Sequence, residues 1–91
     1  MSTKRLVITG SVHGVGFRDW VVETATTLGL AGWVRNRADR SVELLIHGDA
    51  DAVEEMQRAC RRGPRHAEVT ELVEHPADPP EQVGFHRLPT V

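Results

Sequence analysis

The sequence predicts a two-layer α/β (α+β) sandwich, in which two helices cover one face of a mostly antiparallel sheet. Segments with the two-residue period of strands and segments with helical spacing follow one another in the order β-α-β-β-α-β, and a short extended tail has room for a fifth strand. The length of 91 residues is that of one domain. Apolar residues make up 40% of the chain and charged residues 26%, which excludes a disordered, collagen-like or coiled-coil protein.

The first strand is predicted over residues 5–12, where Leu6, Ile8 and Val12 fall on one side of an alternating pattern. Glycines then interrupt the regular backbone, and the apolar residues take up helical spacing over residues 17–28. A strand, a glycine-rich loop and a helix are therefore expected in succession.

Two extended runs, residues 31–37 and 41–47, are separated by a short polar stretch. They predict a β-hairpin. In the first run, alternation places Asn36 on the same face as Gly32 and Val34.

A second helix is predicted over residues 49–63, because a good N-cap precedes a helical stripe of apolar residues. The N-cap is Asp49, and the stripe consists of Val53, Met56 and Cys60. Cys60 is therefore expected in the core rather than as a nucleophile.

The last long strand is predicted over residues 66–74, with Ala67, Val69 and Val73 on one face, and the extended tail lies around Phe85. This order of elements is the split βαβ arrangement of the ferredoxin-like fold. Right-handed crossovers place the first and third strands centrally, so the loop after the first strand lies near the middle of one sheet edge.

Composition limits the partners of this predicted single domain over residues 1–91. Eleven Lys and Arg against 13 Asp and Glu give a net charge of −2, and aromatic residues make up 4%, which disfavours nucleic-acid binding. There is no apolar run that could span a bilayer and no signal-peptide core, so we expect a cytoplasmic protein without a membrane partner. The chain is short and has no obvious exposed apolar stripe, so we expect a monomer. One cysteine and five histidines without zinc-site spacing predict no disulfide and no metal.

The segment from Gly10 to Arg18 joins the first strand to the first helix through closely spaced glycines. Such a loop lets backbone N–H groups surround a small anion, and the helix N-terminus adds unpaired donors. The spacing matches neither a P-loop nor a dinucleotide fingerprint, so the loop is either a phosphate cradle or a plain turn. The helix dipole disfavours Arg18 in the first helical turn. Arg18 therefore binds a phosphate, pairs with Asp19 or the sheet surface, or extends into water. Asn36 is likewise either a turn former or a functional amide.

The residues G-x-V-H-G-V-G-F-R at 10–18 and G-W-V-R-N-x-x-D-x-x-V-E at 32–43 resemble the paired signature of the acylphosphatases, and the resemblance covers nearly the whole chain. It implies a small cytosolic hydrolase of the carboxyl-phosphate bond that uses no metal or organic cofactor. It also implies that Arg18 and the loop amides bind the phosphate of an acyl phosphate and that Asn36 positions the attacking water. The implied phosphate-binding residues are His13, Gly14, Val15, Gly16, Phe17 and Arg18.

Two residues depart from the family pattern. Arg40 stands where members commonly have glycine after the hairpin aspartate, so a longer or strained turn is expected. His13 stands where glutamine is frequent, and only its backbone amide is assigned a role. Because this fold hosts many functions, a non-catalytic module that binds an anion is the alternative to a hydrolase.

Overall fold

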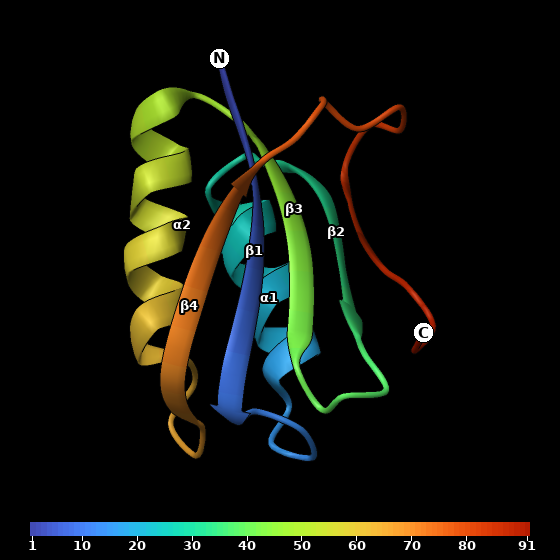
Figure 1. Ribbon diagram of the computed structural model, residues 1–91. Helices are drawn as coiled ribbons and strands as arrows, with labels where there is room; N and C mark the ends of the chain where they lie inside the picture. The colour runs from blue at the N-terminus through green and yellow to red at the C-terminus, as the bar shows by residue number, and fades with distance from the viewer.

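The computed structural model describes all 91 residues and contains one five-stranded sheet with two helices packed against one face (Figure 1). The elements are β1 (Ser2–Ser11), α1 (Phe17–Thr27), β2 (Ala31–Asn36), β3 (Val42–Gly48), α2 (Ala50–Arg62), β4 (Glu68–Pro76) and β5 (Phe85–Arg87). The predicted two-layer sandwich is confirmed, including the short fifth strand. Neither helix is long and apolar enough to cross a bilayer.

The strands lie in the order β4-β1-β3-β2-β5, so β1 and β3 are interior strands as predicted. β1 pairs antiparallel with β3 and β4, β2 pairs antiparallel with β3, and β5 runs parallel to β2. The loop from β1 to α1 and the hairpin between β2 and β3 lie at the same end of the sheet (Figure 1). This topology brings together the two segments that the sequence singled out.

A cluster of 14 buried apolar residues fills the space between the sheet and the helices. It includes the predicted stripe of α2, in which Val53, Met56 and Cys60 are fully buried. Asp49 caps α2 as predicted, because its carboxylate accepts a hydrogen bond from the Asp51 N–H at 3.2 Å. Burial raises the pKa of the Cys60 thiol to about 12, so this group is a protonated core residue near neutral pH.

The prediction that Val73 shares the core-facing side of β4 with Ala67 and Val69 is wrong. The pairing register with β1 shifts at Gly10, which leaves Thr70 as the extra residue of a β-bulge. The bulge inverts the alternation, so Leu72 packs against the core while Val73 is 38% exposed. Both residues are apolar, and the local sequence therefore contains no signal that separates the two registers.

The open face of the sheet holds one buried carboxylate. Glu43 on β3 is 6% exposed and accepts hydrogen bonds from Arg5 Nη1 on β1 and from Arg35 Nε on β2, each at 2.8 Å. Arg35 also lies over the Trp33 ring, 4.7 Å from its centroid. Burial alone would raise the pKa of Glu43, but hydrogen bonds from Arg35 and Arg5 outweigh it and hold the pKa below its ordinary value.

Replacing Glu43 with glutamine is expected to lower the free energy of unfolding by about 2 kcal/mol near neutral pH, because Arg5 and Arg35 lose their shared counter-charge. The pKa of Glu43 is lower in the folded protein than in the unfolded chain. The wild-type protein is therefore more stable than the variant by the full amount at pH values above the ordinary glutamate pKa. This difference in the free energy of unfolding disappears as the pH falls through the folded-state pKa. Urea denaturation of both proteins across this acidic range checks the prediction. A stability difference that does not change with pH would contradict it.

Candidate active site

Buried side chains hold the loop between β1 and α1 at both ends. Val12 is 1% exposed and Phe17 is 2% exposed, and the Phe17 ring packs edge-on against Trp20 with 5.5 Å between the ring centroids. Between these anchors, Gly14 and Gly16 have φ values of 72° and 75°. Glycine adopts this left-handed region without strain, so the chain can turn tightly into the first turn of α1.

Backbone N–H groups of this loop face no partner within the protein backbone. Among the backbone hydrogen bonds outside the helices and strands, none is donated by residues 13–19. Gly16 is the N-cap of α1 and provides no side-chain cap, so the first turn of the helix keeps its unpaired donors. Successive free N–H groups and the positive end of the helix dipole together attract an anion. The loop therefore has the geometry of an anion cradle.

A cavity of about 140 Å³ lies between this loop, the end of β2 and β5. Its lining residues are Val12, Gly14, Gly16, Phe17, Arg18, Asp19, Asn36 and Arg87. All the predicted site residues are among them except His13 and Val15. Val15 packs instead against the hydrophobic core. The structure thus brings Arg18 and Asn36, which come from distant parts of the sequence, to one small cavity.

Asn36 ends β2 on the same inward face as Val34, as the alternation predicted. Its Oδ1 atom is buried and has no hydrogen-bond partner within the protein. Its backbone is held in place, because the Val91 N–H donates to the Asn36 carbonyl at 3.1 Å. A buried acceptor without a partner costs free energy, and such a group in a native structure is often explained by function. Asn36 therefore presents a free acceptor at the cavity.

The side chain of His13 has a structural contact that no sequence pattern predicted. Its Nε2 donates to the Ser41 carbonyl at 2.9 Å, which ties the loop to the hairpin that follows Asn36. The hairpin is itself braced, because the Ser41 hydroxyl and N–H both donate to Asp39 Oδ1, at 2.5 and 3.0 Å. Both hydrogen bonds lower the pKa of Asp39, and the bond from the Ser41 hydroxyl has the larger effect. His13 and Ser41 thus fix the relative position of the loop and Asn36.

The strain expected in the hairpin turn is present at Arg40, which has a φ of 73°. Replacing Arg40 with glycine is expected to raise the free energy of unfolding by about 1 kcal/mol. In the left-handed region the Cβ atom of an L-residue lies too close to a backbone carbonyl oxygen, and glycine has no Cβ atom. The Arg40→Ala variant is the control, since it removes the guanidinium but keeps Cβ. Urea denaturation of both variants checks the prediction, and equal stabilisation by both would assign the effect to the guanidinium.

Two charged residues meet at the cavity from opposite ends of the chain. Arg87 on β5 donates from Nη1 to the Asp19 carboxylate on α1, across 68 sequence positions. Asp19 is therefore paired with Arg87, while Arg18 takes part in none of the ion pairs of the structure. Sequence patterns did not indicate Arg87, because only the pairing of β5 with β2 brings it to this place.

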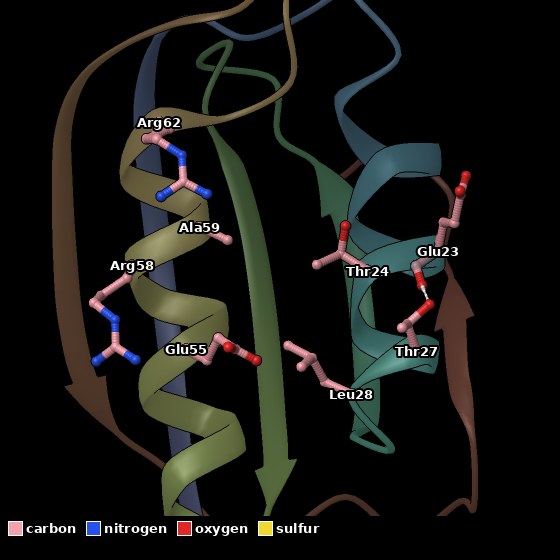
Figure 2. A pocket seen from close by; sticks show the side chains of 8 residues that line it. All are labelled: Glu23, Thr24, Thr27, Leu28, Glu55, Arg58, Ala59 and Arg62. Carbon is pink, nitrogen blue, oxygen red and sulfur yellow. Dashed lines mark hydrogen bonds between the residues drawn. The ribbon is translucent and has the colours of Figure 1, made fainter.

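The largest cavity lies elsewhere, in an open groove of about 430 Å³ between α1 and α2 (Figure 2). Its lining residues are Glu23, Thr24, Thr27, Leu28, Glu55, Arg58, Ala59 and Arg62. The Thr27 hydroxyl is satisfied by the Glu23 carbonyl at 2.9 Å, and no buried side-chain atom of the groove lacks a partner. The smaller cavity has the free amides and the orphaned acceptor, so it is the better candidate for chemistry. No three His, Cys, Asp or Glu side chains of the protein converge as metal ligands would.

A family model, sequence relatives and a solved structure all match this protein to the same family. The acylphosphatase family model matches residues 4–87. The acylphosphatase of Acidiphilium cryptum is 58% identical over 90 residues, covering 99% of both chains, and that of Rhodospirillum rubrum is 53% identical over the full length of both chains. The crystal structure of the Bacillus subtilis acylphosphatase matches with a TM-score of 0.90 at 34% identity, covering 97% of this chain and 99% of that chain. The protein therefore belongs to the acylphosphatase family.

Proposed function

We propose that this protein hydrolyses the carboxyl-phosphate bond of small acyl phosphates, giving a carboxylate and inorganic phosphate. Membership of the acylphosphatase family supports this activity. The observation that carries the assignment of the site is the buried Oδ1 of Asn36, which has no partner and borders the cavity that Arg18 also lines. A water molecule held there lies beside a phosphate bound in the cradle.

The phosphoryl group is bound by the backbone N–H groups of residues 13–18 and by the Arg18 guanidinium. In a loose phosphoryl-transfer transition state, negative charge stays on the three equatorial oxygens. Preorganised amide donors and a guanidinium stabilise that charge without further reorganisation. Arg18 has no ion pair with the protein, so its planar fork is available for two parallel hydrogen bonds to phosphate oxygens.

Asn36 positions the attacking water. Its Oδ1 accepts one water hydrogen and thereby aims an oxygen lone pair at phosphorus, opposite the departing carboxylate. The bond from phosphorus to the water oxygen forms as the bond to the acyl oxygen breaks. The carboxylate leaves without a proton because its conjugate acid has a pKa of about 4, and the water proton passes to a phosphate oxygen. The mechanism therefore needs no protein general acid or base.

A non-catalytic anion-binding module on the same fold is the alternative, and the homologues named acylphosphatase disfavour it. The test is turnover of benzoyl phosphate by the purified protein, with p-nitrophenyl phosphate as the monoester control and with a chelator in a parallel assay. We expect hydrolysis of the acyl phosphate alone, at a rate that the chelator leaves unchanged. A folded protein that binds phosphate but hydrolyses no acyl phosphate would be the binding module instead.

We also infer that residues 1–91 work as a single acylphosphatase-like domain and as a cytoplasmic monomer, without a nucleic-acid or membrane partner. The chain has one core cluster, which supports a single domain. The large apolar side chains that are exposed are few, namely Met1, Val73, Val83 and Val91, which supports a monomer. Cys60 is buried and free, so the fold needs no oxidising compartment. Light scattering of the purified protein tests the monomer.

A further inference from the structure

The proposed mechanism leaves one cation of the cavity without a role. Arg87 lines the cavity with Arg18 and Asn36, and these two arginines are its only cationic lining residues. The Arg87 side chain is 45% exposed and its partner Asp19 is 72% exposed. An ion pair this exposed contributes little to stability, so its presence at the cavity is not explained by folding alone.

The backbone around Arg87 is fixed relative to Asn36. Arg87 is paired with Val34 in the parallel register of β5 and β2. The next residue, Leu88, donates its N–H to the Val34 carbonyl at 2.8 Å. Val34 lies two positions before Asn36 in the same strand. Arg87 therefore extends from an anchored strand, at a constant position beside the residue that we propose to orient the water.

The phosphoryl group does not need Arg87. The loop amides and Arg18 already provide its donors, and the carboxylate of Asp19 on Arg87 would repel it. A guanidinium has five N–H donors, and the structure shows only Nη1 bonded to Asp19. The remaining donors are free to bind a second anionic group, on the part of the substrate that extends out of the phosphate cradle.

We infer that Arg87 is a specificity-determining residue, which favours acyl phosphates whose acyl group carries a second anionic group. This inference rests on the proposed function and concerns the acyl side of the same cavity. Asp19 shares the guanidinium with that group and competes with it. Removal of Arg87 and removal of the Asp19 charge must then have opposite effects on substrate preference, although both break the same ion pair.

The experiment compares 4-carboxybenzoyl phosphate and its 3-carboxy isomer with the matching carbamoylbenzoyl phosphates, which are neutral and similar in shape. The readout is the ratio of kcat/KM for the carboxy substrate to that for the carbamoyl substrate. We expect the wild-type protein to prefer one carboxy isomer, Arg87→Gln to lower that ratio by about fivefold, and Asp19→Asn to raise it. Arg58→Gln, the control on α2, removes an equal charge and should leave the ratio unchanged. Urea midpoints establish that each variant is folded.

Two outcomes would overturn the inference while the proposed function stands. If Arg87→Gln and Asp19→Asn lower the ratio alike, the pair only fastens β5 to α1. If Arg87→Gln slows both substrates by one factor and leaves their ratio unchanged, Arg87 acts on the phosphoryl group and not on the acyl group. The proposed function fails in a different way, because the wild-type protein would then hydrolyse none of the four substrates.

Discussion

Replacing Arg18 with alanine is expected to reduce kcat/KM for benzoyl phosphate by about 10³-fold, while the protein stays folded. A guanidinium that stabilises the charge of a phosphoryl-transfer transition state contributes an effect of about this size. Arg18 has no ion pair with the rest of the protein, so its removal leaves no buried charge uncompensated. Hydrolysis followed by ultraviolet absorbance gives the rate, and calorimetry with inorganic phosphate gives the accompanying loss of affinity.

Two further variants sharpen the Arg18 experiment. Arg18→Lys keeps the charge but loses the planar fork, so its activity should fall between those of the wild-type and alanine proteins. Arg58→Ala removes a guanidinium from the groove between the helices and should retain wild-type activity (Figure 2). If folded Arg18→Ala kept most of its turnover, the cradle would not be the site of catalysis.

Replacing Asn36 with alanine is expected to reduce kcat by about 10²-fold, because the water is no longer held in line with the bond that breaks. Phosphate affinity should be retained, since the loop amides and Arg18 are untouched. The free energy of unfolding should stay the same or rise, because the variant removes the buried Oδ1 that has no partner. Initial rates, phosphate calorimetry and urea denaturation measure the three quantities.

The combination of lost turnover and retained stability distinguishes a functional amide from a turn former. A turn-forming Asn36 would instead lose stability on substitution, with activity falling only as far as the fold does. Asn36→Asp is the matched variant, because it keeps the size and an acceptor but adds a negative charge beside the phosphate. It should lose both turnover and phosphate affinity. An alanine variant that lost phosphate affinity and turnover together would show that Asn36 binds phosphate instead of water.

The sequence alone determined the order of the elements, most of the core and the family. Alternation and helical spacing are local properties, so Leu6, Ile8 and the Met56 stripe of α2 could be assigned without knowledge of their partners. At Arg40 the departure from the family pattern predicted a longer or a strained turn, and the positive φ in the structure shows that the turn is strained. Arg18 and Asn36 were found from their motifs, and their catalytic roles stay predictions.

Tertiary structure decided what depends on pairing between distant segments. The bulge at Thr70 turned Val73 outward, because register is set by the neighbouring strand and not by the strand's own residues. The contact of His13 with Ser41 and the ion pair of Arg87 with Asp19 join segments that no period or motif connects. Such contacts exist only once the sheet has formed. The sequence therefore indicated Arg18 on the phosphate side of the cavity but gave no sign of Arg87 on the side where we propose that the acyl group binds.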